Sequence, residues 1–264
     1  MEISSLQNAR VKQLVLLQQK SQERRRTGLF VVEGQRELMH CIEAGYEVVE
    51  LWVESGRWKE EGDFKPQTSN LKSQTLYEVT PKVYEKIACR GTTEGVIGVV
   101  RERRLTLDAL QLPASPLIVV LESVEKPGNL GAVLRSADAA GADAVIVCDP
   151  LTDLYNPNLI RASLGACFCV PFIACSSEEC IAFFKQHHIR ILTAQLQDSS
   201  LYYDTDMQGP TAIVMGTEST GLTDQWRQAA DAHIRIPMLG RMDSLNVSVS
   251  AAILLFEAVR QRQG

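Results

Sequence analysis

Three polar loops in the second half of the sequence carry residue types that could bind a ligand and assist chemistry. They span residues 122–129, 216–222 and 237–244, and each follows an apolar run that is typical of a buried strand. In an open parallel sheet, ligands bind where the carboxyl ends of strands meet their loops. We therefore expect the three loops to open on one edge of a sheet and to form one site.

The third loop leads into a helix near the C-terminus. Pro237 ends the short strand before the loop, because proline has no N–H to donate to a sheet. Asp243 or Ser244 could cap the helix that follows. This helix is apolar around most of its circumference, which predicts burial in the core or against a partner subunit. Polar groups in its first turn, among them Ser244 and Asn246, fit either a capped core helix or the wall of a ligand pocket.

Short motifs exclude several common classes of enzyme. The glycines of the first loop have G-x-x-G spacing, so the dinucleotide-binding fingerprint G-x-G-x-x-G is absent there. The chain also lacks the phosphate loop G-x-x-x-x-G-K-[ST], the nucleophile elbow G-x-S-x-G and the zinc motif H-E-x-x-H. The usual motifs of dehydrogenases, kinases and hydrolases are therefore missing.

The composition predicts a globular protein, and the lack of long apolar segments predicts a cytoplasmic one. The 264 residues are 45% hydrophobic and 22% charged, with a formal net charge of −5, which allows one large domain or two modest ones. No apolar run approaches the roughly 18 residues of a membrane span. The N-terminus lacks the apolar core of a signal peptide. We expect a cytoplasmic location and no membrane partner.

The seven cysteines do not suggest a metal site. Cys167, Cys169, Cys175 and Cys180 are close in sequence, but their gaps are irregular and do not match paired C-x₂-C spacing. Buried reduced cysteine usually behaves as a small apolar side chain. We therefore expect neither a metal nor a disulfide.

Strands and helices alternate in both halves of the chain, which predicts two α/β domains. Residues 105–116 contain two prolines and form the expected linker between a domain at 1–104 and a domain at 117–264. The net charge of −5 argues against a nucleic-acid partner, but 17 of the 27 cations precede residue 105. The basic run Arg24, Arg25 and Arg26 is either a solvated face or a patch that contacts phosphates.

Motifs in the second half resemble those of the SpoU-type RNA 2′-O-ribose methyltransferases. They read PGNLGAVLRSA at 127–137, VMGTESTGL at 214–222, IPM at 236–238 and SLNVS at 244–248, in the order of the family. The run RASLGACF at 161–168 is also similar to the family. The front half, with FVVEG at 30–34, resembles the substrate-binding domain of many members, which is similar to a ribosomal RNA-binding protein.

The resemblance implies a trefoil-knotted, open parallel-sheet methyltransferase domain and a small N-terminal α/β RNA-binding domain. It also implies S-adenosylmethionine as cofactor, no metal, and a homodimer whose site borders the subunit interface. We expect ribosomal RNA as substrate because the front domain resembles a ribosomal binder. Transfer RNA is the alternative substrate, and a non-catalytic RNA-binding assembly factor or a small-molecule α/β enzyme are alternative functions.

The resemblance also implies roles for individual residues. Arg135 would act at the ribose hydroxyl, either as the base or as a clamp on the phosphate and the developing alkoxide. We favour the clamp, because guanidinium is effectively always protonated. Without the family, Arg135 could simply pair with a carboxylate such as Glu218, Asn129 could be a helix cap, and the cofactor residues could be a tight turn and core aliphatics. The assigned cofactor residues are Gly216, Ile236, Met238, Ser244 and Leu245. The other catalytic residues are Asn129, Glu218, Ser244 and Asn246, and the RNA-binding residues are Arg24, Arg25, Arg26 and Arg135.

Overall fold

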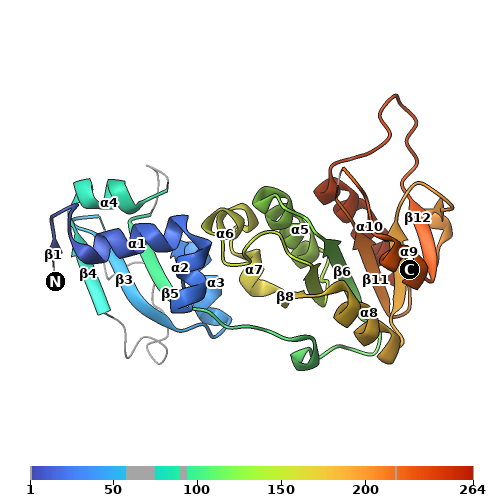
Figure 1. The fold of residues 1–264 in the computed structure, drawn as a ribbon, viewed down its shortest axis with the longest axis horizontal. Helices are drawn as coiled ribbons and strands as arrows, with labels where there is room; N and C mark the ends of the chain where they lie inside the picture. Colours follow the sequence, from blue (N-terminus) through green and yellow to red (C-terminus); the bar gives the residue numbers. More distant parts are fainter. Residues whose placement is uncertain (1, 58–74, 90–93, 218, 264) are drawn as a thin grey trace. The chain divides into compact units, whose positions relative to one another are not determined.

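The computed structural model describes residues 2–57, 75–89, 94–217 and 219–263. Two compact units make up the chain, each built on its own sheet (Figure 1). The first unit combines Met1–Arg103 with Asp153–Cys169, and the second combines Arg104–Thr152 with Val170–Gly264. Part of the second half of the sequence therefore belongs to the first unit, a feature for which the sequence had no signal.

The first unit contains a five-stranded mixed sheet in the order β1-β4-β3-β5-β2. β4 pairs in parallel with β1 and β3, whereas β5 pairs antiparallel with β3 and β2. A small mixed sheet of this kind agrees with the α/β domain expected for the front half. The strands are β1 (Glu2–Ile3), β2 (Leu29–Glu33), β3 (Val48–Glu54), β4 (Thr75–Val79) and β5 (Val96–Arg101).

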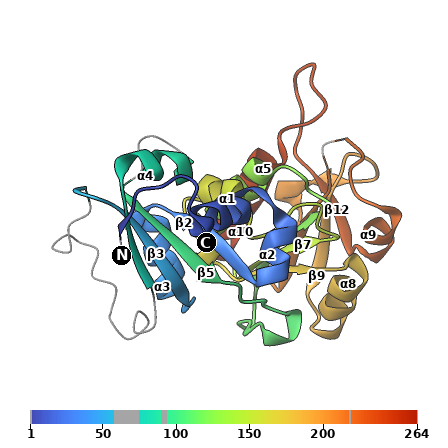
Figure 2. The same cartoon turned by 60° about the vertical axis from the view of Figure 1, so that its left-hand side comes forward.

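Helices cover both faces of this sheet. α1 (Ala9–Gln19) and α4 (Pro81–Ile87) share one apolar cluster with Ile97 and Val99 of β5 (Figure 2). α3 (Gln35–Glu43) lies on the other face, where its Leu38 packs over Gly98, because successive residues of a strand point to opposite faces.

The segment 153–169 packs on the first unit through two short helices. α6 (Pro157–Ser163) contacts β2, and α7 (Ala166–Cys169) contacts α3. Tyr155 stacks on Phe30 with ring centroids 4.3 Å apart, and Tyr46 and Phe168 complete this aromatic cluster. Such aromatic pairs add stability beyond the area that they bury.

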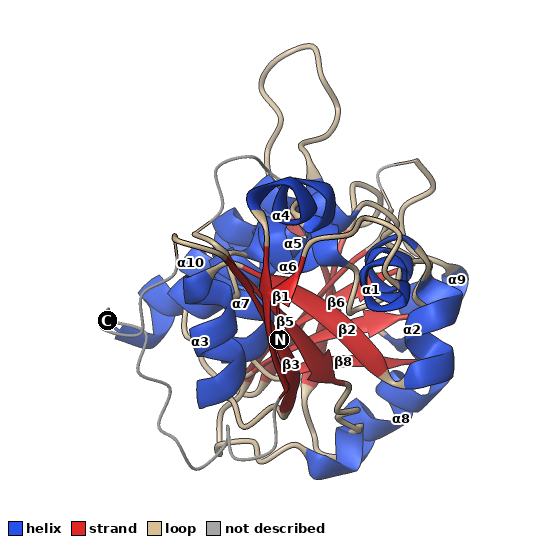
Figure 3. Ribbon diagram, turned by 90° about the vertical axis from the view of Figure 1, so that its left-hand side faces the viewer, coloured by secondary structure: helices blue, strands red, loops and turns tan. Residues whose placement is uncertain are grey.

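The second unit is a seven-stranded parallel sheet in the order β10-β12-β9-β11-β6-β7-β8. Two of its strands, β6 and β8, are labelled among the red arrows of Figure 3. All six strand pairings are parallel. The apolar runs at 117–121 and 211–215 are β6 and β11, which pair with each other at the centre, as expected for strands buried on both faces. The strands are β6 (Leu117–Glu122), β7 (Ala144–Cys148), β8 (Phe172–Cys175), β9 (Arg190–Ala194), β10 (Ser200–Leu201), β11 (Thr211–Met215) and β12 (Ala232–Arg235).

Two pairs of helices cover this parallel sheet. α8 (Ser177–Gln186) and α9 (Asp224–Ala229) contribute Phe184 and Trp226 to a cluster with the even-numbered residues of β6 and β7. α5 (Pro127–Ala139) packs against α10 (Val247–Gln263), and these helices contact β7 and β11. The expected open α/β sheet is confirmed.

The C-terminal helix α10 is buried on one side and exposed on the other. Val247, Ala251 and Leu254 are buried, whereas Val249 and Phe256 are 47% and 49% exposed. The exposed pair lies on an apolar stripe with Leu245 and Ala252, at spacings of three and four residues. Core packing thus accounts for one apolar side of α10 and leaves the other at the surface. No helix among the described residues has the length and apolar character to cross a membrane.

Candidate functional site

A cavity of about 390 Å³ lies in the second unit where β9, β11 and β12 end. Its walls come from the segments 194–197, 215–217, 219–222, 234–236 and 243–245, together with Arg227, Met238, Val247 and Ser250. β12, β9 and β11 are neighbours in the sheet, so their loops open on the same edge, as expected for a parallel α/β sheet. The size falls within the range of small-molecule sites.

The loop after β11 brings backbone to the wall of this cavity. A Cβ atom on Gly216 would collide with the backbone of Gly221 and Leu222. Gly221 has a φ of +68° and donates from its N–H to the carbonyl oxygen of Thr217 at 3.0 Å. Only glycine fits at position 216, because the two sides of the loop approach so closely there.

All five residues assigned to the cofactor lie in the wall of the cavity: Gly216, Ile236, Met238, Ser244 and Leu245. They come from the loops after β11 and β12, which the sequence analysis placed at one site. Ser244 is exposed and its hydroxyl donates to Asp243 at 3.3 Å. The wall therefore combines aliphatic side chains with backbone and hydroxyl groups.

The loop after β9 also lines the cavity, and the sequence analysis did not include it. Gln195 follows β9, and its side-chain Nε2–H donates to the backbone carbonyl of Gln197 at 2.9 Å. Its Oε1 atom is buried and has no hydrogen-bond partner among the described residues. Buried polar atoms normally have a partner, so this acceptor is a candidate contact for a bound ligand or water. The apolar run before Gln195 was the signal that could have found it.

The first predicted loop does not line the cavity but is bonded to those that do. Glu122 ends β6 and is 3% exposed, and its carboxylate accepts from the N–H and hydroxyl of Thr223 at 2.9 and 2.7 Å. Thr223 precedes α9, which follows the Gly216 loop. Asn129, in the first turn of α5, accepts at Oδ1 from the side-chain N–H of Asn246 at 3.1 Å. The three loops therefore form one bonded set around the site.

Asn246, rather than Asp243 or Ser244, caps α10. Its Oδ1 atom accepts from the N–H of Ser248 at 3.0 Å and from the Ser248 hydroxyl at 2.6 Å. Its backbone carbonyl accepts from the N–H groups of Val249 and Ser250. The expected cap at Asp243 or Ser244 was wrong, because the loop continues to Leu245 and the helix begins at Val247.

Arg135 is exposed on α5, beside the buried side chains of Val133 and Leu134. It does not line the cavity. The guanidinium is therefore open to solvent and available to a large ligand such as RNA. Glu218, the other charged residue assigned to catalysis, lies outside the described residues.

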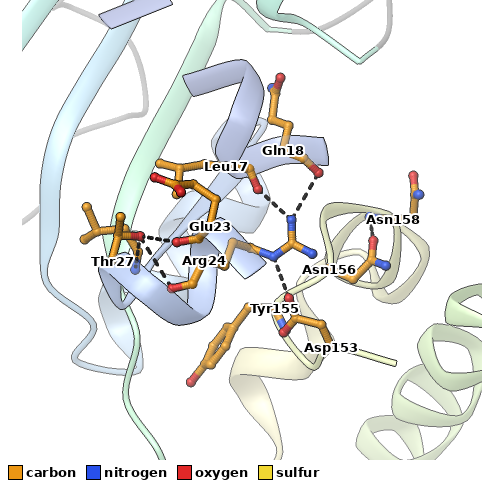
Figure 4. Close-up of polar contacts among 10 residues, drawn as sticks. Leu17, Gln18, Glu23, Arg24, Thr27, Asp153, Tyr155, Asn156 and Asn158 are labelled. Atoms are coloured by element: carbon orange, nitrogen blue, oxygen red, sulfur yellow. Dashed lines mark hydrogen bonds and ion pairs between the residues drawn. The ribbon is translucent and has the colours of Figure 1, made fainter. Parts of the chain in front are cut away.

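The basic run in the first unit separates into one buried and two exposed arginines. Arg24 is 5% exposed, and its guanidinium donates to Asp153 at 2.5 Å and to the carbonyls of Leu17 and Gln18 (Figure 4). Arg24 thus fixes the segment 153–169 to the first unit and is not available to RNA phosphates. This corrects the expectation that all three arginines contact RNA, because a basic run looks uniform in sequence.

Arg25 and Arg26 remain at the surface of α2 (Ser21–Thr27). The hydrogen bonds from Arg26 lower the pKa of Glu23 to about 2, with a further contribution from Gln13. Glu23 therefore stays charged at neutral pH and offsets part of the positive charge of this patch.

Both halves of the sequence match models of known protein families. The model of the SpoU rRNA Methylase family matches residues 116–256, and the model of the MRM3-like substrate binding domain matches residues 8–98. The chain belongs to the SpoU rRNA methylase family and carries an N-terminal MRM3-like substrate-binding domain. The predicted family is confirmed.

Individual relatives match nearly the whole chain. The 23S rRNA (guanosine-2′-O-)-methyltransferase RlmB of Bordetella pertussis is 33% identical over 235 residues, which is 86% of this chain and 94% of the relative. A solved RNA 2′-O ribose methyltransferase is 40% identical with full coverage of both chains and a TM-score of 0.84. The AdoMet-bound rRNA methyltransferase from Sinorhizobium meliloti is 30% identical, with a TM-score of 0.87 and coverage of 98% of this chain and 97% of that one.

These findings confirm the predicted activity and cofactor at the level of the family. The chain is an S-adenosylmethionine-dependent ribosomal RNA 2′-O-ribose methyltransferase of the SpoU family. A relative similar over nearly the whole chain holds AdoMet in its crystal structure.

Proposed function

We propose that this enzyme methylates a ribose 2′-hydroxyl of 23S ribosomal RNA in the cytoplasm, with S-adenosylmethionine in the cavity beside Gly216. The observation that carries the proposal is the cavity itself, which lies at the carboxyl ends of three parallel strands. Its wall contains Gly216, where only glycine fits against the neighbouring backbone, and the buried Oε1 atom of Gln195, which has no partner among the described residues. The similarity to RlmB supports 23S RNA as the substrate.

The wall of the cavity fits this cofactor by its chemistry. Ile236, Met238 and Leu245 provide apolar surface for the adenine ring, and the backbone around Gly216 provides hydrogen-bonding groups. The free Oε1 atom of Gln195 accepts from an amino or hydroxyl group of the cofactor. When bound, S-adenosylmethionine would supply the methyl group, whose bond to the sulfonium sulfur breaks as the bond to the ribose oxygen forms.

The remaining work is to position the ribose and to stabilise its oxygen as the hydroxyl proton passes to solvent water. Arg135 holds the target phosphate and stabilises the developing alkoxide, which a permanently protonated guanidinium can do. Asn129 and Asn246, bonded to each other at 3.1 Å, orient the ribose from the first turns of α5 and α10. Ser244 and Glu218 assist them.

The same catalytic domain forms a homodimer through the exposed side of α10. Large apolar side chains gather on this helix and the loop before it: Leu239 is 96%, Met242 71%, Phe256 49%, Val249 47% and Leu245 37% exposed. Exposed apolar surface of this extent supports a protein interface. Phe256→Asp, on the outer side of α10, should convert the dimer to a monomer in light-scattering measurements, whereas Arg260→Ala at the same exposed surface should leave it intact.

A dimer interface at α10 brings the site to the subunit boundary, since Leu245 lines the cavity and precedes this helix. Mixing Arg135→Ala with Gly216→Ala, at a cofactor concentration too low for Gly216→Ala to turn over, tests whether one site uses both subunits. Activity regained on mixing means that Arg135 serves the cofactor of the partner subunit. A mixture as inactive as its components places Arg135 and Gly216 in the same subunit's site.

The two parts of the chain divide the work. Residues 1–104, with the segment 153–169 packed on them, form the part that binds RNA. Residues 105–116 link the domains, and the rest of 117–264 forms the methyltransferase domain with the trefoil knot of its family. Arg25 and Arg26 contact phosphates. Replacing both by alanine therefore lowers the slope of binding against salt by about two, one for each lost phosphate contact. The control Arg190→Ala, at a half-exposed arginine of the second unit that is bonded to Asp206, should leave the slope unchanged.

The direct test is transfer of labelled methyl from S-adenosylmethionine to ribosomal RNA from cells that lack the gene. Digestion should yield label on a 2′-O-methyl nucleoside of 23S RNA. Arg135→Ala should abolish transfer and keep cofactor affinity, and near-normal turnover in this variant would remove Arg135 from the mechanism. Label on transfer RNA instead would mean that transfer RNA, and not ribosomal RNA, is the substrate. Absence of both cofactor binding and label would favour an assembly factor.

A further inference from the structure

Three cysteines converge at the edge of the parallel sheet away from the cofactor cavity. Cys148 ends β7, Cys175 ends β8, and Cys180 lies in the second turn of α8. Their sulfur atoms all lie within 4.8 Å of one another. Cys148 and Cys180 are buried and Cys175 is partly exposed. β6 lies between β7 and β11, which is the strand of the cavity nearest to this edge.

The backbone holds these three side chains in place. Cys148 and Cys175 are direct partners in the parallel pairing of β7 with β8, so their side chains lie on the same face of the sheet. α8 begins immediately after β8 with a capping box between Ser176 and Glu179, which sets the position of Cys180 over that face. The thiols from β7, β8 and α8 are therefore held close together.

The spacing of the sulfurs fits a metal ion. A zinc–sulfur bond of about 2.3 Å places three sulfurs around one ion roughly 3.8–4.0 Å apart. The observed upper limit of 4.8 Å is close enough for small side-chain rotations to complete such a site. Three protein ligands leave a fourth position for water, and the partly exposed Cys175 gives an entry path.

The charges near the cluster favour a cation over a reactive thiolate. Asp149 follows Cys148 and Glu179 precedes Cys180, and both carboxylates accept hydrogen bonds at the start of α8, from Ser177 and Ser176. Reactive cysteines usually lie beside cationic groups, but the charged neighbours here are acidic. An ion of positive charge is stabilised both by the sulfurs and by these carboxylates.

We propose that Cys148, Cys175 and Cys180 bind one thiophilic divalent d¹⁰ ion, of which Zn²⁺ is the biological representative. Soft thiolate ligands select such ions. The bound ion ties β7, β8 and α8 together and stabilises the second unit. This site is independent of the proposed RNA substrate and of the cofactor cavity.

The test uses the full-length protein, reduced, treated with chelator and kept free of oxygen. Cd²⁺ serves as the probe because cadmium thiolates absorb in the ultraviolet. Titration should reach an end point of one Cd²⁺ per chain, Zn²⁺ should displace it, and Zn²⁺ should raise the melting temperature. No thiolate band in the wild-type protein would overturn the proposal.

Variants separate this site from adventitious thiols. Cys175→Ser and Cys180→Ser should each weaken Cd²⁺ binding by at least about 100-fold, since loss of a mere outer-shell partner already costs 10- to 100-fold. The control Cys89→Ser/Cys169→Ser removes two exposed cysteines outside the cluster and should bind as the wild type does. Cys175 lies at the partly exposed end of an edge strand, so its variant tests the site even where Cys180→Ser fails to fold. Unchanged binding in Cys175→Ser, or loss of binding in the control, would refute the assignment.

Discussion

The two halves of the seven-stranded sheet differ in how their buried polar groups are paired. We call β7 and β8 with the groups beyond them the closed edge, and the ends of β9, β11 and β12 at the cavity the open edge. Beyond β7 and β8, Asp149 accepts from the N–H and hydroxyl of Ser177, and the Ser177 hydroxyl accepts from the indole N–H of Trp226 at 2.9 Å. At the edge formed by β9, β11 and β12, the buried Oε1 of Gln195 has no partner among the described residues. Matched groups at one edge stabilise the fold, and the unmatched group at the other is a candidate contact for a bound ligand or water.

The largest effect is expected at the open edge, from Gly216→Ala. The added methyl collides with the backbone of Gly221 and displaces the loop that forms the wall of the cavity. We expect S-adenosylmethionine affinity to fall about 10- to 100-fold, in line with the ~1–3 kcal/mol that overpacking costs. Calorimetric titration measures it. Gly209→Ala is the matched control, because its Cβ meets no atom within 4 Å. Equal affinity in both variants would contradict the role of Gly216.

The closed edge should respond in stability and not in cofactor binding. Ser177→Ala removes the acceptor of the buried Trp226 N–H and should destabilise the second unit by about 2 kcal/mol. That corresponds to a fall of about 4–8 °C in the melting temperature. The relevant transition is the one that S-adenosylmethionine shifts. Ser200→Ala, at an exposed serine, should leave it unchanged. A weaker cofactor affinity in Ser177→Ala would mean that the two edges are coupled.

Replacing Asn246 should affect both stability and activity, because Asn246 caps α10 and also bonds to Asn129. Asn246→Ala should cost about 1 kcal/mol of stability through the lost cap, and methyl transfer should fall more than cofactor affinity does. Asn246→Asp keeps the cap acceptor and should restore the melting temperature. Full transfer activity in Asn246→Ala would show that the contact between α5 and α10 is structural only.

The smallest effect is expected from the unmatched acceptor. Gln195→Leu removes one neutral hydrogen bond to the cofactor and should weaken S-adenosylmethionine by about 2- to 10-fold, or ~0.5–1.5 kcal/mol. Gln208→Leu, an exposed glutamine of the same unit, is the control. If Gln195→Leu raises the melting temperature without weakening the cofactor, the buried acceptor is a packing defect and the contrast between the edges disappears.

Much of the site could be predicted from the sequence because its residues follow strands that are easy to recognise. Apolar runs of five residues, as at 117–121 and 211–215, are typical of strands buried on both faces, and the motifs lie directly after them. All five predicted cofactor residues line one cavity for this reason. The loop with Gln195 follows the same rule and was missed only because it carries no recognised motif.

Local sequence by itself determined the strands, most helices, the order of the motifs and hence the family, since these depend on short-range spacing and side-chain type. Tertiary structure alone decided three other features. It buried Arg24 against Asp153 while leaving Arg25 exposed, it joined the segment 153–169 to the first unit, and it brought Cys148 to Cys175 and Cys180. In each case the partners are distant in sequence, and only strand pairing and packing bring such residues together.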